Sequence, residues 1–309
     1  MALLINAFFG KPEDWRKMIA AELPNEDVRV WPEIGNREDI EVAAIAHVPH
    51  GTLKTFPNLR LIVSLLAGAD VLLGDPELPA GIPIVRAGDP NGDEMMSEAA
   101  LTHVLRHHRH LPAYLLAQQR SEWISLPRVR ASERKVGVLG LGAIGLAAAR
   151  VLADHGFRVA GWVRQPRKVD GIEVFHGRAQ LPAFLARSEI VVNLLPLTAE
   201  TRGILNREAF TALPKGAALV NLGRGAHVVD ADLIAALDSD HLAGATLDVF
   251  TTEPLPKESP LWRHPKITIT PHVARRLELR DLVPRMCEAI KKMRAGQKLD
   301  HLVDRARGY

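Results

Sequence analysis

Short apolar runs alternate with segments of helical periodicity along most of the chain. In the first hundred residues, four such runs predict β-strands: LLINAF, VRVW, VAAIAH and LRLIVSLL. Between the first two, the segment EDWRKMIAAEL carries apolar residues at helical spacing and predicts a crossover helix. Strands that alternate with helices are typical of parallel sheets built from βαβ units.

A second series of apolar runs predicts a second sheet. After a long helical pattern over about residues 97–120, the series runs KVGVLG, FRVAGW, IVVNLL, AALVNL, GATLDV and KITIT. Six strands in this arrangement would complete a dinucleotide-binding fold. The last helical pattern, LVPRMCEAIKKMRAG, has no strand partner in this series and is expected to return to the first block.

Length and composition narrow the class of protein. A chain of 309 residues favours two domains, and 47% hydrophobic with 24% charged residues is typical of a globular protein rather than a disordered or membrane protein. The net charge, 39 minus 36 or +3, comes from scattered basic residues and argues against nucleic-acid binding. The single cysteine, Cys287, excludes an intramolecular disulfide and favours the cytoplasm. The opening MALLINAFFG lacks a preceding basic region and predicts a buried strand rather than a leader.

Gly140, Gly142 and Gly145 have the G-x-G-x-x-G spacing of a dinucleotide site. The motif follows the apolar run VGVL and precedes the helix-forming LAAARVLADHG, which is the context that the motif requires. The first glycine makes the tight turn, the second lets a pyrophosphate approach the backbone, and the third allows the helix to pack on the strand. The alternative is a tight turn with no ligand.

The cations Arg164, Arg167 and Lys168 lie where a carboxylate would grip the adenine ribose. They follow the strand FRVAGW, about 20 residues beyond the glycine motif. Because arginine binds phosphate with paired donors, these residues favour NADP(H), with its 2′-phosphate, over NAD(H), whose use remains possible. The alternative is a solvated basic turn without selectivity.

Candidate catalytic residues follow three later strands. Arg224 lies in NLGRG, Asp248 and Glu253 in LDVFTTEP, and His272 in TPH. Residues just beyond the carboxyl ends of parallel strands share one crevice, so these side chains are expected to converge despite their separation in the sequence.

With these motifs in place, the sequence resembles the D-2-hydroxyacid dehydrogenase family over almost its whole length. The segments that carry the resemblance are GLGAIG, NLLPLTAETRGILN, NLGRGAHVVDADLIAAL, LDVFTTEPLP and TPHVA. The turn WVRQPRK, the segment ESPLWRHPKITITPHVA and the terminal VDRARGY look closest to its glyoxylate/hydroxypyruvate reductase A branch. The resemblance implies NADPH-dependent reduction of a small 2-keto acid, such as glyoxylate or hydroxypyruvate.

The resemblance also implies roles for individual residues. Arg224, Glu253 and His272 match the family's catalytic trio, and Asp248 matches the aspartate that holds the nicotinamide amide. The family's substrate loop, GAGxD, is matched by LAGAD, which retains Ala67, Gly68 and Asp70 but has Leu66 in place of the first glycine. Further cofactor contacts are implied for Ala143, Ile144, Leu195, Pro196 and Gly223.

The chemistry of this trio follows from the residue types. Reducing a keto acid requires a hydride at the carbonyl carbon and a proton at its oxygen, where negative charge develops. His272 is expected to supply the proton as general acid, with Glu253 favouring and orienting its charged form. Arg224 cannot lose its charge, so it can hold the substrate carboxylate and stabilise the developing alkoxide.

The resemblance implies two Rossmann-like α/β domains with parallel sheets. The substrate domain is expected at residues 1–98 and 281–309, interrupted by the NAD(P)-binding domain at 99–280. The resemblance also implies a homodimer that forms through the helical segment THVLRHHRH, residues 102–110. Two alternatives stay open: a dehydrogenase for a bulkier D-2-hydroxy acid, which Leu66 makes worth testing, and a non-catalytic dinucleotide-sensing protein, against which the intact trio argues.

Two other features invite functional readings. His103 and His107 are four residues apart on a helical pattern, a spacing that can bind zinc, but no cluster of acids or cysteines accompanies them. We therefore predict no metal site. Trp123 and Trp262 are expected to pack against other residues rather than bind a ligand.

Overall fold

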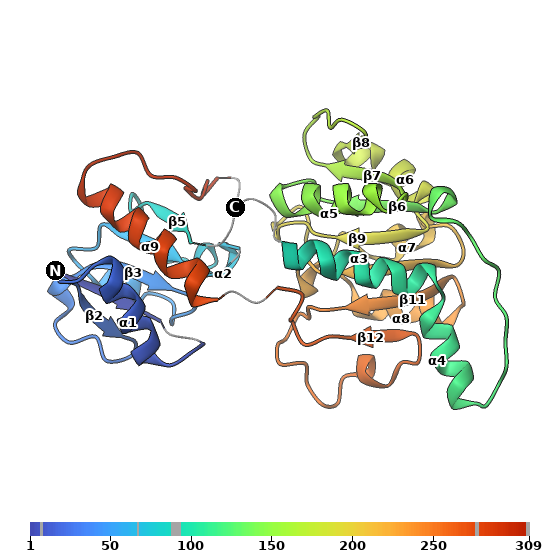
Figure 1. The fold of residues 1–309 in the computed structure, drawn as a ribbon, viewed down its shortest axis with the longest axis horizontal. Coiled ribbons are helices and arrows are strands. Elements are labelled where there is room, and N and C mark those ends of the chain that lie inside the picture. The colour runs from blue at the N-terminus through green and yellow to red at the C-terminus, as the bar shows by residue number, and fades with distance from the viewer. Residues whose placement is uncertain (7–8, 67, 88–93, 276–277, 307–309) are drawn as a thin grey trace. The chain divides into compact units, whose positions relative to one another are not determined.

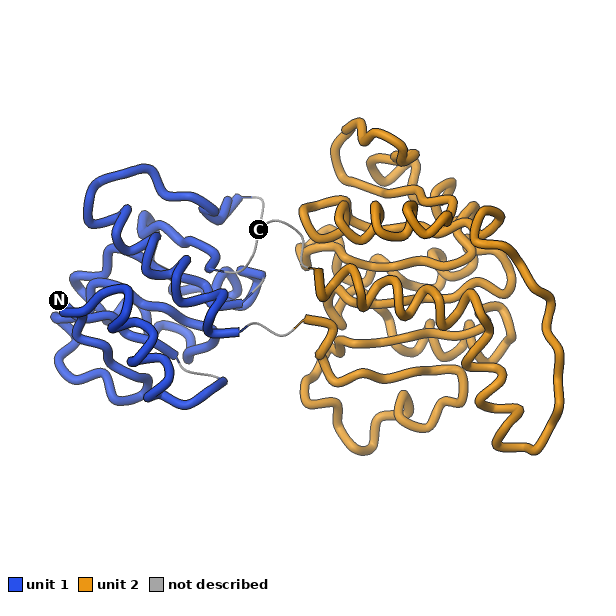
Figure 2. The backbone as a smooth tube through the Cα atoms, viewed as in Figure 1, with its two compact units in different colours: residues 1–90, 277–309 blue, residues 91–276 orange. Residues whose placement is uncertain are grey.

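The computed structural model describes residues 1–6, 9–66, 68–87, 94–275 and 278–306. The chain forms two compact units (Figure 2), one comprising Met1–Pro90 with Leu277–Tyr309 and the other Asn91–Arg276. Each unit is an α/β layer structure around a fully parallel sheet, which confirms the predicted fold class. Among the helices of the described ranges, none is long and apolar enough to cross a membrane.

Unit 1 contains a five-stranded sheet in the order β2-β1-β3-β4-β5. Its strands are β1 Ala2–Ile5, β2 Asp27–Val30, β3 Ile40–Ile45, β4 Leu61–Ser64 and β5 Ile84–Arg86, and its helices are α1 Pro12–Glu22, α2 Asp70–Leu73 and α9 Leu279–Arg294. Short 3₁₀ turns lie at η1 Arg37–Asp39 and η2 Leu53–Thr55. Helices α1 and α9 bury their apolar residues, including Trp15 and Met286, against one face of this sheet (Figure 1).

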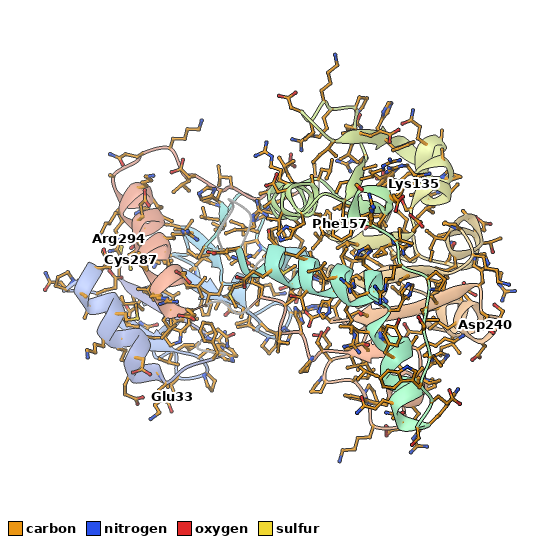
Figure 3. All side chains as sticks on the ribbon, turned by 45° about the vertical axis from the view of Figure 1, so that its right-hand side comes forward. Glu33, Lys135, Phe157, Asp240, Cys287 and Arg294 are labelled. Atoms are coloured by element: carbon orange, nitrogen blue, oxygen red, sulfur yellow. The ribbon has the colours of Figure 1, made fainter. Side chains whose placement is uncertain are left out.

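An ion-pair network fastens the C-terminal helix to unit 1. Arg294, near the end of α9 (Figure 3), donates to Glu26 at 2.6 and 2.8 Å and to Glu41 at 2.8 and 3.0 Å. Glu41 is fully buried on β3 and also accepts from Arg60 at 2.8 Å. Since a buried carboxylate needs compensating donors, these arginines stabilise Glu41 and help to hold α9 on unit 1.

Unit 2 contains a seven-stranded sheet in the order β12-β11-β10-β9-β6-β7-β8. Its strands are β6 Lys135–Leu139, β7 Arg158–Val163, β8 Glu173–His176, β9 Ile190–Asn193, β10 Ala217–Asn221, β11 Leu242–Leu247 and β12 Ile267–Ile269. Its helices are α3 Glu94–His108, α4 Leu111–Gln119, α5 Ala143–Asp154, α6 Gly177–Arg187, α7 Arg207–Ala212 and α8 Asp230–Asp238, with 3₁₀ turns η3 Ala131–Glu133, η4 Gly225–His227 and η5 Pro260–Arg263.

The two faces of this sheet have separate cores. Helices α3 and α5 cover the face that presents Val136 and Val138 of β6, and they lie side by side in Figure 1. Helices α6, α7 and α8 cover the opposite face, where Phe184 and Phe210 are buried. The strand order reverses between β6 and β9, and such a reversal creates the crevice in which doubly wound sheets bind ligands.

Three sequence predictions were wrong in detail. The second sheet has seven strands rather than six, because β8 is a short, partly exposed edge strand with little apolar signal. The first sheet has a fifth strand, β5, which is only three residues long. The single helix predicted over residues 97–120 is two helices, because His110 adopts a left-handed backbone with φ 57° and Pro112 opens α4.

Candidate active site

His272 and Glu253 form a close ion pair at the end of the sheet. The Nδ1 of His272 lies 2.6 Å from Oε2 of Glu253. The other carboxylate oxygen accepts the backbone N–H of Phe250 at 2.8 Å, so the loop itself orients Glu253. An ionised carboxylate only accepts hydrogen bonds, so Nδ1 carries the proton that faces it. The side chain of His272 remains 50% exposed, which leaves its Nε2 able to meet a ligand.

The backbone around His272 is held by Asp248. His272 has a left-handed φ of 54°, which is uncommon for a residue with a side chain. Its N–H donates to the carbonyl of Asp248 at 2.8 Å. The Asp248 carboxylate, which is buried, accepts from the Thr270 hydroxyl at 2.6 Å and from the N–H groups of Val273 and Ala274 at 2.9 and 3.0 Å. Asp248 therefore joins the loop after β12 to the end of β11. Its contact with a nicotinamide amide stays a prediction.

Arg224 lies on a loop that packs directly against the loop of Glu253. A side chain at Gly225 would place its Cβ 1.9 Å from the carbonyl carbon of Phe250 and 2.2 Å from the nitrogen of Thr251. Only a glycine allows the two backbones to approach this closely. The guanidinium of Arg224 is half-buried and donates to the carbonyl of Gly223 at 2.8 Å.

Arg224, Asp248 and His272 follow β10, β11 and β12, which are neighbours in the sheet. The carboxyl ends of these parallel strands meet at one edge, so the fold gathers the residues that the sequence separates.

The sequence analysis missed three polar residues beneath this edge. Asn193 and Asn221 end β9 and β10, and His227 ends η4; all three side chains are fully buried. They hydrogen-bond to one another and to the loop of Arg224. The available signal was an asparagine as the last residue of an otherwise apolar strand, in IVVN and again in AALVN.

The glycine loop has the shape of a pyrophosphate cradle. Gly140 has φ 92°, and a Cβ there would lie 3.0 Å from the carbonyl of Leu194. A Cβ on Gly145 would lie only 1.8 Å from the carbonyl of Gly140, so the third glycine is required for packing. A Cβ on Gly142 would have no neighbouring atom of the described structure within 4 Å. Gly142 precedes α5, whose first turn contains Ala143 and Ile144 and offers the amide donors of a helix N-terminus.

The basic turn lies next to this loop. Arg167 donates to the carbonyl of Leu141, within the glycine motif, at 2.6 Å. Arg164 is 3.6 Å from Glu200 and partly exposed, and Lys168 is exposed. The predicted cofactor residues Leu195 and Pro196 follow β9 on the other side of β6. The end of β6 is thus surrounded by the cations of the basic turn, the N–H groups at the start of α5 and the uncovered backbone of Gly142. Together these groups fit a dinucleotide with an extra phosphate.

The predicted substrate loop belongs to unit 1. Ser64, at the end of β4, has its hydroxyl 3.4 Å from the carbonyl of Leu66 and 3.3 Å from that of Gly68. Ala67 lies outside the described residues. The partly buried side chain of Leu66 packs against the core of unit 1. The contacts of Gly68 with a substrate stay a prediction.

The histidines of α3 have structural contacts. His107 is buried and lies 2.9 Å from the hydroxyl of Thr246, and burial, followed by the charge of Arg106, lowers its pKa to about 4. His108 packs edge-on against Phe157. His103 borders a hollow of about 250 Å³ that Asp248 and Thr270 also line. Within the part of the chain that the structure describes, no group of three or more histidine, cysteine or acidic residues could hold a metal ion.

Comparison with known proteins identifies the family of the chain. The family model "D-isomer specific 2-hydroxyacid dehydrogenase, NAD binding domain" matches residues 101–274. A curated glyoxylate/hydroxypyruvate reductase A of Serratia proteamaculans (strain 568) is 40% identical over 97% of each chain. The chain belongs to the D-isomer specific 2-hydroxyacid dehydrogenase family.

Solved structures of this family match both units. A D-isomer specific 2-hydroxyacid dehydrogenase of Xanthobacter autotrophicus Py2, in complex with NADPH and MES, is 44% identical with a TM-score of 0.93 over 100% of this chain and 99% of that one. An NADPH-dependent glyoxylate/hydroxypyruvate reductase of Sinorhizobium meliloti, in complex with NADP and sulfate, is 36% identical with a TM-score of 0.91 over the whole of both chains.

Proposed function

We propose that the protein reduces glyoxylate, hydroxypyruvate or a closely related small 2-keto acid with NADPH. The observation that carries the proposal is the 2.6 Å pair of His272 and Glu253, next to the loop of Arg224, in a chain of this family. The relatives named as glyoxylate/hydroxypyruvate reductases support the substrate class. Unit 1 would serve as the substrate domain and unit 2 as the nucleotide-binding domain.

The residues divide the chemistry between them. When bound, a reduced nicotinamide supplies the hydride that reaches the carbonyl carbon. His272 donates the proton of its Nε2 to the carbonyl oxygen, and the imidazole that remains keeps its Nδ1–H on Glu253. Arg224 pairs with the substrate carboxylate and stabilises charge on the carbonyl oxygen as the hydride arrives. The 2-oxo group of the substrate thereby gains a hydride at its carbon and a proton at its oxygen, and the product is the 2-hydroxy acid.

We infer that NADPH is preferred because the exposed Arg164 and Lys168 belong to the turn that Arg167 joins to the glycine loop. Arg164→Asp should raise the KM for NADPH roughly tenfold or more, since one charge-assisted phosphate contact is lost and a repulsive charge is added. The KM for NADH should change little. Initial rates of glyoxylate reduction with each cofactor provide the measurement, and better use of NADH than NADPH by the unaltered protein would contradict the inference.

We further propose a homodimer that forms through α4 and the segment after it. Residues 122–130 form neither helix nor strand and run along the edge of unit 2 (Figure 1). Hydrogen bonds from Leu126 to the Tyr114 hydroxyl and between His110 and Pro127 hold this segment to α4. Trp123 is fully exposed in the single chain, contrary to the packing role expected from the sequence, and Leu111 and Leu115 are half exposed.

Such an apolar surface is typical of an interface between subunits. Trp123→Ser should shift sedimentation from the dimer toward the monomer, because a central aromatic contact often dominates an interface. A monomeric unaltered protein would contradict the proposal.

A cytoplasmic location also remains a proposal, and it rests on the single, buried Cys287.

A further inference from the structure

Three fully buried polar side chains lie beneath the loop of Arg224. Asn193, Asn221 and His227 are surrounded by apolar strand ends, and polar groups in such a place destabilise the fold unless each is hydrogen-bonded. The sheet does not require them, because backbone groups already form its ladders. Their hydrogen bonds go instead to the backbone of two loops, the one that carries Arg224 and the one that carries Leu195 and Pro196.

Backbone partners determine the orientation of each side chain. The N–H of Arg224 donates to Nδ1 of His227 at 3.1 Å, so Nδ1 carries no proton. The proton is therefore on Nε2, which donates to the carbonyl of Pro196 at 3.2 Å. The N–H of Gly223 donates to Oδ1 of Asn221 at 3.2 Å, and Nδ2 of Asn221 donates to the carbonyl of Arg224 at 3.1 Å.

Asn193 joins these two side chains. Its Nδ2 donates to Oδ1 of Asn221 and to Nδ1 of His227, both at 2.8 Å. Its Oδ1 accepts the N–H of Leu195 at 3.3 Å. Both backbone polar groups of Arg224 are thus held by side chains from different elements, and the same network holds the neighbouring loop.

We propose that His227 is a positioning residue that sets the Arg224 loop for the substrate carboxylate through the acceptor Nδ1 of its neutral imidazole. The inference rests on the proposed function, because it assigns the effect to substrate binding by Arg224. The Nε2 contact is dispensable, since the carbonyl of Pro196 also accepts from the Thr201 hydroxyl at 2.7 Å. The Nδ1 contact has no such substitute among these side chains, and its loss takes a hydrogen bond from the partly buried N–H of Arg224.

Two substitutions separate these contacts. In His227→Asn the side-chain Oδ1 takes the place of Nδ1 and can accept from Arg224, whereas in His227→Gln the side-chain Nε2 can donate to Pro196 but the Nδ1 acceptor is missing. Both variants remove a ring from a packed interior, so both should lose thermal stability. Only His227→Gln should lose activity, by roughly 10- to 100-fold in kcat/KM for glyoxylate.

The loss should fall mainly on the KM for glyoxylate, with the Kd for NADPH within about threefold of the unaltered protein in both variants. Equal activity losses in the two variants, or full activity in His227→Gln, would overturn the proposal.

Nitrogen-15 NMR of labelled protein gives a test that needs no turnover. The His227 signals, assigned by their loss in His227→Asn, should show an unprotonated Nδ1 and a protonated Nε2; the opposite tautomer would sink the inference. Absence of glyoxylate turnover in the unaltered protein would instead overturn the proposed function and leave the NMR result standing.

Discussion

His272→Ala should lower kcat/KM for glyoxylate reduction by about 10²- to 10⁴-fold, which is the usual contribution of a general acid. The substitution removes the proton donor, so that Arg224 alone is left to stabilise the negative charge that develops on the carbonyl oxygen. NADPH binding should be unchanged, because the glycine loop and the basic turn follow β6 and β7, whereas His272 follows β12. Steady-state rates and fluorescence titration with NADPH would measure the two effects separately.

Glu253→Gln should give a smaller effect in the same experiment. Glutamine keeps the size of the side chain but removes the negative charge next to the His272 ring, while the ring itself stays in place, so activity should fall less than in His272→Ala. His155→Ala is a suitable control, because His155 is an exposed histidine just after the C-terminal end of α5, the end away from the glycine loop, and its loss should leave the rates unchanged. If His272→Ala retained near-normal turnover, or lost NADPH binding in parallel with activity, His272 would not be the general acid. A protein that binds NADPH tightly and shows no turnover with any 2-keto acid would favour the dinucleotide-sensing alternative.

Alanine substitutions at Gly142 and Gly145 should produce opposite phenotypes. The space beside Gly142 is open, and its φ of −65° is accessible to alanine, so Gly142→Ala should fold with an unchanged melting temperature. The new methyl group would occupy the place where a pyrophosphate approaches the backbone, and NADPH affinity should fall roughly tenfold or more. Isothermal titration and a thermal melt on the same sample would test both expectations.

Gly145→Ala should damage the fold itself. Its Cβ would lie 1.8 Å from the carbonyl oxygen of Gly140, and neither backbone can move without separating α5 from β6. Overpacking of this kind destabilises a protein by about 1–3 kcal/mol, and the melting temperature falls by roughly 2–4 °C per kcal/mol in a domain of this size. A stable Gly145→Ala variant would contradict the close packing of this loop on α5, and a Gly142→Ala variant with normal NADPH affinity would show that the loop does not bind the phosphates.

The sequence predicted the features that depend on neighbouring residues. Alternating apolar runs and helical patterns are local signals, and they predicted both parallel sheets. Glycine spacing and strand ends are also local, so the motif at Gly140 and the positions of Arg224 and His272 could be located before any coordinates. The same reasoning missed β5 and β8, because strands of only three or four residues carry too little periodicity to be detected.

Contacts between distant residues were decided only by the tertiary structure. Sequence reasoning could pair His272 with Glu253. It could not show that the backbone N–H of Phe250 donates to the other carboxylate oxygen of Glu253. Nor could it show that the Asp248 carboxylate accepts hydrogen bonds from backbone N–H groups of the loop after TPH. Nor could it assign the imidazole of His227 to one tautomer, since that choice depends on a backbone N–H and a carbonyl supplied by different loops. Chain order therefore determined which groups reach the edge of the sheet. Their protonation and orientation were determined by packing, because a buried hydrogen bond exists only once both of its partners have been brought together.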